Sequence, residues 1–446
     1  MNKAMKNSGI EWIGEVPENW QVSKCGNFFE IVLGKMLQPT RANSSDTFES
    51  YLSAINLGNN TLKYEPIKHM WFSESDKATL NINNGDLLVV EGGDVASSDI
   101  ARNAPSGLHF QNSLMRVRVI NTEHDIRFLR YWLMSAKSAG YVELICNKAT
   151  IMHFPKNKLI NFPYVYIEAI SEQKNIVDSL DYRCAKIDRL IALQEEMIAE
   201  LHAYKQSAIT EAVTKGLDPD VPMKDSGVDW IGEIPENWQS AKCGNFFEIT
   251  LGKMLQPSSG SSLDSLEDYL SAINLGNNAL KLEPIKKMWF SELEKELYKI
   301  KKGDLLIIEG GDVASSDIVH DISCDLFFQN SLMRVRAKSE EHDVRFLRYW
   351  LVSVKSSGYI ELLCNKATIM HFPKNKLVNL PYVYVSSISE QREVADYIDD
   401  KCEKIEHMIF LRQSKIDTLK EYKKSLIYEC VTGKRDCTMG RPKDGA

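Results

Sequence analysis

The longest regular pattern of apolar and polar positions begins near Ser171 and continues without a break to Gly216. Apolar residues recur seven or fourteen positions apart along one line, and a second line follows three positions later. Such spacing gathers apolar residues on one stripe of a helix, as in a coiled coil. The two lines contain Leu180, Ile187, Leu201 and Ala208, and then Leu190, Met197 and Tyr204. The pattern predicts a long helix, a rod of roughly 65 Å at ~1.5 Å per residue.

The same pattern returns after Ser389 and predicts a second long helix. Its members are Ile398, Ile405, Leu419 and Leu426, with Met408 and Tyr422 in the second line. Ile191 with Ile198, and Ile409 with Ile416, widen both stripes, so each helix is expected to touch more than one neighbour. Ser171 and Ser389 are placed to cap the helix starts, and Gly216 and Gly433 stand where the helices would stop.

The preceding stretch, from Ser8 to about Val165, has a different texture. Short apolar runs such as "GDLLVVEGG" and "SLMRVRVI" are separated by Gly, Asn, Pro and Ser, and "HDIRFLRYWLMSAKSAG" has helical spacing. Short strands bounded by turn residues, mixed with helices, are typical of an α/β domain.

An offset of 218 residues carries the first half of the chain onto the second without a gap, from Ser8 and Ser226 to about Thr214 and Thr432. Each copy is far longer than a solenoid repeat, so it predicts a whole domain followed by its long helix, with a pseudo-two-fold relation between the copies. The boundaries expected are a first domain at 8–167, a helix at 168–216, a second domain at 217–385, a helix at 386–434 and a disordered tail at 435–446.

Composition narrows the class of protein. Of 446 residues, 43% are hydrophobic and 26% charged, which is typical of a folded chain with real cores. No signal peptide or apolar stretch long enough for a membrane span occurs, so a cytoplasmic location is expected. Nine cysteines, an odd number without zinc-ligand spacing, predict neither disulfides nor metal. A net charge of −7 disfavours non-specific coating of nucleic acid, so any DNA contact would be local.

Catalytic signatures are missing from the sequence. There is no phosphate-binding loop, no dinucleotide fingerprint and no paired-histidine metal motif. "NFPY" at Asn161 and "NLPY" at Asn379 resemble a methyltransferase loop only partly, and a strand leaving the domain is the better interpretation. Trp12 and Trp20, repeated at Trp230 and Trp238, are interpreted as anchors that pin the start of each domain. A non-catalytic chain is expected.

One candidate DNA-binding surface is a basic stretch without acidic residues, "NKATIMHFPKNKL". Lysines suit phosphates, while Asn, Thr, His and Lys can bond to base edges. Its candidate contacts are Asn147, Lys148, Thr150, His153, Lys156 and Lys158 in the first copy, and Asn365, Lys366, Thr368, His371, Lys374 and Lys376 in the second. A solvated basic loop is the alternative.

A second candidate surface is the strand "FQNSLMRVR". Alternate arginines lie on one face of a strand, and Gln or Asn pairs well with adenine and Arg with guanine. The residues proposed are Gln111, Asn112, Arg116 and Arg118, with Gln329, Asn330, Arg334 and Arg336 in the second copy. Arginines on a merely solvated face are the alternative.

The opening "WIGEVPENW", the helix start "ISEQ" and the helix end "YKQSAITEAVTKG" recur as "WIGEIPENW", "ISEQ" and "YKKSLIYECVTGK". Together they resemble the specificity subunits of type I restriction-modification enzymes. The resemblance covers residues 8–434 and implies two target-recognition domains, each reading half of a bipartite DNA site, held apart by two antiparallel helices. It also implies docking of two methyltransferase subunits and of motor-nuclease subunits. S-adenosylmethionine, ATP and magnesium would then be used by those partners, and no cofactor by this chain.

The two domains here are near copies, whereas those of such subunits are generally dissimilar. Similar domains related by a two-fold axis should read similar sequences on opposite strands, so an interrupted palindrome is predicted. The main divergence, "ARNAPSGLHF" against "VHDISCDLFF", could alter the half-sites slightly if that loop touches bases. Two alternatives stay open: a DNA-binding repressor or decoy acting alone, and a protein-binding adaptor with duplicated domains.

Overall fold

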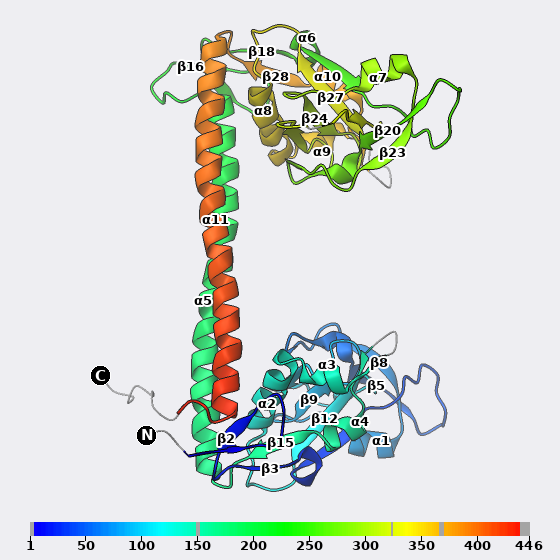
Figure 1. The fold of residues 1–446 in the computed structure, drawn as a ribbon, viewed down its shortest axis with the longest axis vertical. Helices are drawn as coiled ribbons and strands as arrows, with labels where there is room; N and C mark the ends of the chain where they lie inside the picture. Colours follow the sequence, from blue (N-terminus) through cyan, green and yellow to red (C-terminus); the bar gives the residue numbers. More distant parts are fainter. Residues whose placement is uncertain (1–3, 149–151, 323, 365–369, 438–446) are drawn as a thin grey trace. The chain divides into compact units, whose positions relative to one another are not determined.

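The computed structural model describes residues 4–148, 152–322, 324–364 and 370–437. The chain forms two compact units, Met1–Gln194 with Ser414–Ala446 and Glu195–Gln413. Each unit therefore combines one copy of the α/β domain with part of both long helices, and the elements recur in almost the same order in the two copies (Figure 1). The predicted α/β class is confirmed. The units do not follow the sequence boundaries, because each long helix is shared between them.

The centre of unit 1 is a four-stranded antiparallel sheet in the order β10, β9, β12, β4. Its strands are β4 (Phe29–Leu33), β9 (Leu87–Val90), β10 (Ser98–Ile100) and β12 (Leu114–Val119). All four side chains of β9 are buried. Leu87 and Val89 join one apolar cluster and Leu88 and Val90 another, because alternate side chains of a strand point to opposite faces and both faces are covered.

A smaller sheet, in the order β11, β5, β8, covers one face of the central sheet. Its strands are β5 (Thr47–Leu52), β8 (Lys68–Phe72) and β11 (His109–Phe110). The other elements of this domain are β1 (Met5–Asn7), β2 (Glu15–Pro17), β3 (Gln21–Lys24), η1 (Cys25–Asn27), η2 (Ala54–Asn56), β6 (Leu57–Gly58), β7 (Thr61–Leu62), α1 (Glu74–Thr79), α2 (Ile126–Ser138), α3 (Tyr141–Ile145), β13 (Asn147–Lys148), β14 (Met152–His153), α4 (Lys156–Ile160) and β15 (Pro163–Tyr166).

Unit 2 repeats this plan, with a central sheet in the order β19, β27, β24, β25 and a smaller sheet in the order β23, β20, β26. Its elements are β16 (Met223–Asp225), β17 (Glu233–Pro235), β18 (Gln239–Lys242), α6 (Cys243–Phe246), β19 (Phe247–Leu251), β20 (Ser265–Leu270), η3 (Ala272–Asn274), β21 (Leu275–Gly276), β22 (Ala279–Leu280), β23 (Lys286–Phe290), α7 (Glu292–Tyr298), β24 (Leu305–Ile308), β25 (Ser316–Ile318), β26 (Phe327–Phe328), β27 (Leu332–Ala337), α8 (Val344–Ser356), α9 (Tyr359–Leu363), α10 (Lys374–Asn379) and β28 (Pro381–Tyr384).

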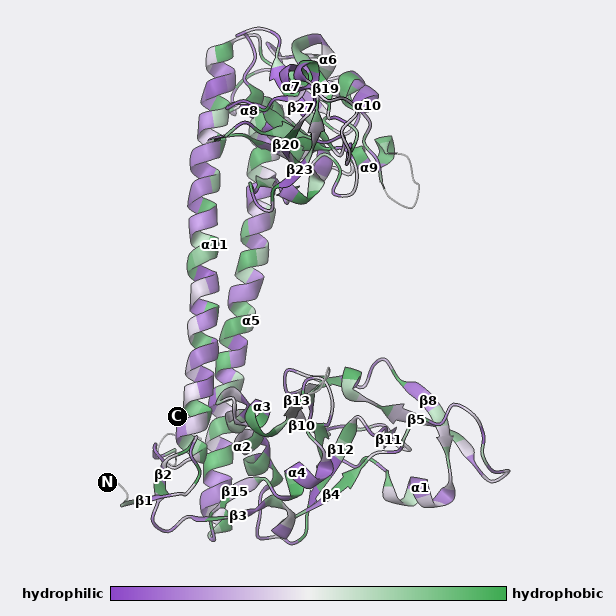
Figure 2. Ribbon diagram, turned by 45° about the vertical axis from the view of Figure 1, so that its right-hand side comes forward, coloured by the Kyte–Doolittle hydropathy of each residue, from purple (hydrophilic) through white to green (hydrophobic). Residues whose placement is uncertain are grey.

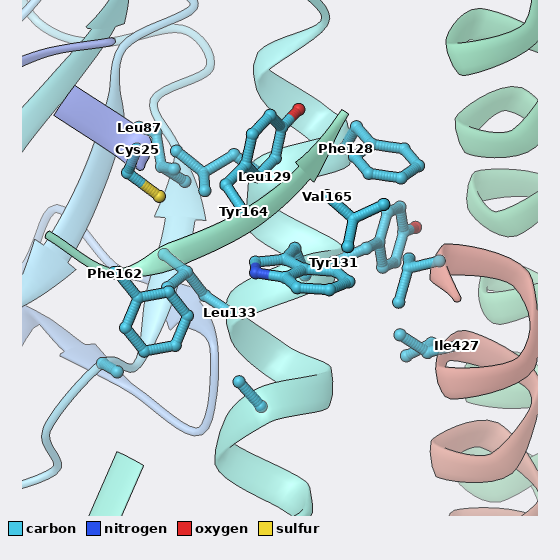
Figure 3. Packing of buried hydrophobic residues seen from close by; sticks show 14 of the residues in the cluster. Cys25, Leu87, Phe128, Leu129, Tyr131, Leu133, Phe162, Tyr164, Val165 and Ile427 are labelled. Atoms are coloured by element: carbon cyan, nitrogen blue, oxygen red, sulfur yellow. The ribbon is translucent and has the colours of Figure 1, made fainter. Parts of the chain in front are cut away.

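The second face of the central sheet in unit 1 is covered by α2, whose buried side chains recur at helical spacing. Figure 3 shows Phe128 and Leu129 of α2 beside Tyr164 and Val165 of β15. Ile427, from the second long helix, belongs to the same cluster. The domain and the helices of unit 1 thus share one continuous core.

The tryptophans at the start of each domain are anchors, as predicted. Trp20 is buried with its ring edge-on to Phe128, and the Trp12 ring lies 5.1 Å from that of Trp132. In unit 2, the Trp230 ring lies 5.4 Å from that of Trp350. Large aromatic surfaces packed in this way fix where the chain enters the domain.

The two predicted rods are single unbroken helices, α5 (Ile170–Lys215) with 46 residues and α11 (Ile388–Val431) with 44. Both begin one residue before the serines expected to cap them, so Ser171 and Ser389 lie in the first turn and that prediction is wrong. The predicted stops are correct, because Gly216 and Gly433 follow the helices with φ of 75° and 72°, a left-handed conformation that suits glycine. Figure 2 shows apolar and polar residues interspersed along both helices.

Within each unit the start of one long helix lies beside the end of the other, so the pairing is antiparallel. In unit 1, Lys423 Nζ of α11 lies 2.6 Å from Asp188 Oδ1 of α5. In unit 2, Lys205 Nζ lies 2.6 Å from Glu406 Oε1. The offset of 218 residues converts one ion pair into the other with the two helices exchanged. Each unit therefore builds the same helix contact from opposite halves of the repeat.

The seam between the helices differs in part from the predicted stripe. Leu180, Ile187, Ile398 and Ile405 are buried, and Leu201 and Leu419 are half-buried, as the first line of the pattern predicts. The second line is wrong: Leu190, Tyr204, Met408 and Tyr422 are 43%, 50%, 40% and 46% exposed. The inward positions lie four residues after the first line: they include Ile191, Ile409 and Ile416, which were predicted to widen the stripe, and also Cys184 and Cys402, which were not predicted. Packing against the domain as well as the partner helix draws the buried stripe to that side.

A disulfide joins Cys430, in the last turn of α11, to Cys437, which contradicts the expectation of reduced thiols only. The chain turns at Gly433 and folds back on the helix end, where Arg435 N donates to Glu429 O at 3.1 Å. An odd number of cysteines cannot reveal that two of them meet around a turn. None of the helices in the described ranges combines the length and apolar content that a membrane crossing requires.

Candidate nucleic-acid interface

Several loops of each domain meet at one edge of the central sheet. Because β12 is antiparallel to both β4 and β9, its first residues lie beside the last residues of those two strands. The loop after β4 (34–38), the turn after β9 (91–95) and the turn before β12 (111–113) therefore come together. The turn after β5 (53–56) and the paired strands β13 (147–148) and β14 (152–153) join them, and we call these five segments the reading edge.

Backbone hydrogen bonds fix three of these segments to the turn 111–113. Asn112 N donates to Lys35 O at 2.8 Å, and Glu91 N donates to Ser113 O at 2.9 Å. Ala54 N donates to Ser113 Oγ at 2.9 Å. The reading edge is consequently a connected, ordered surface, although its segments are distant in sequence.

Strand β14 is attached to the same edge through the glycine turn. Gly93 N donates to Met152 O at 3.2 Å, and Phe154 N donates to Glu91 O at 2.7 Å. His153 Nδ1 lies 3.1 Å from Glu91 Oε2, and the equivalent distance from His371 to Glu309 is 3.0 Å. This explains the conspicuous "EGGDV": its glycines let β14 approach, since a Cβ on Gly92 would lie 3.3 Å from the His153 ring.

The two copies are identical in sequence at the reading edge, as they are in parts of the core such as 24–31 and 127–133, and they differ in several surface loops. Identity is complete over 33–39, 51–60, 91–100, 110–118 and 146–159 with their counterparts. The divergent stretch 101–109 begins at the other end of the sheet, where Gly85 N donates to Ala101 O at 2.9 Å, and the divergent stretch 74–84 leads to that end from α1, whose Asp76 pairs with Lys35 of the reading edge. In the first copy, Ala104 N donates to the Asn84 side chain at this end of the sheet. In the second copy the residue equivalent to Asn84 is Lys302, which forms an ion pair with Asp321 at 3.2 Å. The reading edge is unchanged between the copies while neighbouring loops vary, so it is the candidate for the function that the two domains share.

Gln111 and Asn112 are half-buried on the turn at the centre of the reading edge, as are Gln329 and Asn330. Gln111 Oε1 accepts from Ser113 Oγ at 2.7 Å, and Gln329 Oε1 accepts from Ser331 Oγ at 2.6 Å. These bonds hold the amide groups in place while leaving part of each side chain accessible. Both pairs remain candidates for base contacts.

The arginines that follow have a structural role, which contradicts their predicted role in base recognition. Arg116 and Arg334 are each 3% exposed. Arg116 Nη1 donates to Thr79 O at 2.9 Å and Asn81 O at 2.7 Å, and burial lowers its pKa below the ordinary value. The strand face that carries them is covered by the segment after α1, which the alternation alone could not show.

Arg118 and Arg336 are occupied in a similar way. Arg118 Nε donates to Asp86 Oδ1 at 2.5 Å, a bond that raises the arginine pKa, and Arg336 pairs with Asp304. Guanidinium groups that already satisfy buried carboxylates are not available for guanine. Of the second candidate surface, only Gln111 and Asn112, with Gln329 and Asn330, therefore remain candidates for DNA contacts.

The basic stretch is divided between two places. His153 and His371 are exposed on the reading edge. Lys156 and Lys158 are half-buried on α4, which packs against η1 at the other end of β4, with Gly26 directly under Ile160. The equivalent Lys374 is exposed and Lys376 half-buried on α10. Asn147 and Lys148 form strand β13, and the predictions for Thr150, Asn365, Lys366 and Thr368 fall outside the described residues.

Sequence reasoning missed three apolar side chains at this surface. Met36, Leu37 and Ile55 are 75%, 57% and 60% exposed, and Met254, Leu255 and Ile273 are 75%, 56% and 57% exposed. The signal that could have found them is the identity of these positions between the two copies.

Comparison with known proteins gives consistent matches along the chain. A family model described as type I restriction modification DNA specificity domain matches residues 17–203. Two curated relatives from Methanocaldococcus jannaschii are the type I restriction enzyme MjaVIII specificity subunit and the putative type I restriction enzyme MjaX specificity subunit. They are 23% and 21% identical, covering 94% and 95% of this chain and 93% and 95% of their own lengths.

Solved structures share the fold. A chain from a study of complex assembly and conformational transition of the type I R-M system matches with a TM-score of 0.70 at 15% identity, over 94% of this chain and 99% of its own. The HsdS subunit from Thermoanaerobacter tengcongensis matches with a TM-score of 0.51 at 14% identity, over 94% and 98%. The curated relatives are named as specificity subunits. Over nearly all of its length the chain is similar to type I restriction enzyme specificity subunits, and residues 17–203 match the model of the type I restriction modification DNA specificity domain.

Proposed function

We propose that this chain reads a bipartite DNA target through its two reading edges, one half-site to each domain. The observation that carries the proposal is the identity of the five segments in both copies while neighbouring surface loops change. Identical reading surfaces recognise identical half-sites. The target is then an interrupted palindrome, with the two long helices setting its spacing.

The chemistry of the reading edge suits base recognition. The Gln111 and Asn112 amides can each pair with the N6 and N7 atoms of adenine, at ~1–3 kcal/mol of discrimination per good bidentate contact. His153, exposed and oriented by Glu91, adds a polar group beside them. Apolar Met36 and Leu37 complement thymine methyl groups or the groove floor. Phosphate contacts would come mainly from the partner subunits, because this chain carries a net charge of −7.

We further propose that two methyltransferase subunits dock on the long helices, and that motor-nuclease subunits join them. Exposed apolar side chains support this, because soluble helices rarely expose such residues in clusters without a partner. In unit 1 they are Leu190, Leu193 and Tyr422, and in unit 2 they are Met197, Tyr204, Met408, Phe410 and Leu411. S-adenosylmethionine, ATP and magnesium would be bound by those partners.

Methylation profiling of single DNA molecules, from cells with and without the gene, tests the target. We expect modified adenines in two half-sites that are inverted copies of each other, with modification lost when the gene is deleted. Two unrelated half-sites would contradict the proposal. A matched variant tests the divergent loop: Arg102→His with Asn103→Asp gives the first copy two residues that the second copy has there, and the target should stay the same.

Co-purification tests the partner. Phe410→Asp with Leu411→Asp should release the methyltransferase, whereas Leu293→Asp, at an 81% exposed position on α7, should not. If the chain alone binds its target specifically and no methyltransferase accompanies it, the repressor alternative is favoured. Binding that ignores DNA sequence even with the methyltransferase present would favour the adaptor alternative.

A further inference from the structure

The most exposed apolar side chains of the reading edge stand next to each other on the loop after β4. Met36 is 75% exposed and Leu37 57%, and the equivalent Met254 and Leu255 are 75% and 56% exposed. Exposing two large apolar side chains to water is unfavourable by ~25 cal/mol for each Å² that a partner could cover. The same cost is present in both copies, at the same positions.

The loop that carries these side chains is held on both sides. Before them, Lys35 N donates to Phe110 O at 3.2 Å, and the Lys35 ammonium pairs with Asp76. After them, Gln38 O accepts from Trp71 N at 3.1 Å. Met36 and Leu37 therefore form a short fixed tip, and ordering this tip on a ligand costs little conformational entropy.

Glycine is required at the base of the tip because of a close backbone approach. A Cβ on Gly34 would lie 2.3 Å from Gln111 O, and one on Gly252 would lie 2.3 Å from Gln329 O. The backbone of the loop thus rests directly on the turn that carries the Gln and Asn side chains. Any molecule contacted by those amides also meets the apolar tip.

The identity of the occupant follows from what surrounds the tip. Exposed neighbours along the chain have changed between the copies, since Arg41 corresponds to Ser259 and Phe48, on β5, to Leu266, but Met-Leu has not. Polar amides beside a small apolar tip suit a nucleic-acid groove. A stable protein interface needs roughly 800 Å² from each partner, which two side chains and the nearby Ile55 do not supply.

We propose that each Met-Leu tip is a wedge that enters a base step of its half-site and partly unstacks it, bending the duplex. This inference rests on the proposed DNA-reading function and adds a deformation to it. Proteins that bend DNA from the minor groove insert Phe, Leu, Ile or Met between base steps, and each opened step costs a few kcal/mol. Here the tip would enter from the groove that the amides contact. Steps that open easily would then be favoured at one fixed position in each half-site, without a hydrogen bond to any base.

The test uses the full chain with its methyltransferase subunits and a duplex carrying the profiled target. 2-Aminopurine replaces one adenine at a time, and donor and acceptor dyes at the duplex ends report bending. We expect a several-fold fluorescence rise at one step in each half-site. Met36→Ala with Leu37→Ala should remove the rise in one half-site only, and Met254→Ala with Leu255→Ala in the other.

Leu144→Ala is the matched control, because Leu144 is 72% exposed on α3 and lies outside the reading edge. The wedge variants should keep the melting temperature and the salt dependence of binding, since they remove no buried contact and no phosphate contact. Sequence-specific binding without a fluorescence rise, or a rise that survives in the variants, overturns the wedge and leaves the proposed function intact. If the complex without substitutions does not bind DNA in a sequence-specific way, both the wedge and the proposed function are overturned. Loss of methyltransferase association in the wedge variants would show that the tip is a protein contact instead.

Discussion

Replacement of Arg116 by methionine tests whether this residue supports the fold or reads DNA. The guanidinium is 3% exposed, and Nη1 donates to Thr79 O, to Asn81 O and to Asn81 Oδ1 at 2.7–2.9 Å. Methionine keeps the apolar stem of the side chain but supplies no donor. The two carbonyl groups and the Asn81 side chain would lose their partner inside the domain.

The expected loss follows from the number and kind of these bonds. A hydrogen bond from a charged donor contributes ~1.5–3 kcal/mol, and a buried carbonyl left unsatisfied costs ~1–3 kcal/mol. Because the effects overlap, we expect Arg116→Met to lower the free energy of unfolding of unit 1 by about 3 to 5 kcal/mol. At ~2–4 °C per kcal/mol for a unit of this size, the unfolding midpoint falls by roughly 6 to 20 °C.

Thermal and urea unfolding, followed by circular dichroism, measure the effect, and binding to the profiled target is measured well below the midpoint. Arg334→Met should behave alike in unit 2, because Arg334 Nη1 donates to Leu297 O and Lys299 O at 3.0 and 2.8 Å. Arg102→Met, at an exposed position, should change stability by less than about 0.5 kcal/mol. Unchanged stability of Arg116→Met together with reduced DNA affinity would refute the structural role and restore the predicted base contact.

Three further changes test other contacts. Gly34→Ala should destabilise unit 1 by about 1–3 kcal/mol and weaken DNA binding, because the added Cβ would lie 2.3 Å from the backbone oxygen of Gln111. Gly58→Ala is the control, because a Cβ there meets no atom within 4 Å, and calorimetry and binding titrations compare the two variants. Asp188→Lys should cost up to ~1 kcal/mol in urea unfolding, and adding Lys423→Asp should restore it, unless the 2.6 Å pair contributes nothing in solution. Cys437→Ser should lower unfolding stability by roughly 2.5 kcal/mol in oxidising buffer and have little effect in reductant, and equal effects in both would argue against the disulfide.

The sequence by itself determined the parts of this protein that depend on local pattern and on repetition. Leu180 and Ile187 recur at helical spacing, so α5 was predictable, and the gapless repeat then required α11. Trp12 and Trp20 were predictable as anchors, because large aromatic side chains beside a proline turn at the start of a domain usually pack into its core. The candidate amides Gln111 and Asn112 could be proposed because they precede a strand with a clear alternation.

Only the tertiary structure decided which of these side chains are available. Alternation places Arg116 and Arg118 on one face of β12 but cannot tell whether that face meets water or another segment. The seam of the long helices likewise depends on a second neighbour, the domain, which adds Cys184 to the inward positions and leaves Leu190 exposed.

The reading edge shows the same division most directly. Its segments lie near residues 35, 54, 91, 112 and 153, and only the pairing of β12 with β4 and β9 brings them together. Sequence identity between the copies marks these segments as unchanged, but it gives them no common location. Contacts between residues far apart in the chain depend on which strands become neighbours, and a local pattern of apolar and polar residues carries no information about that choice.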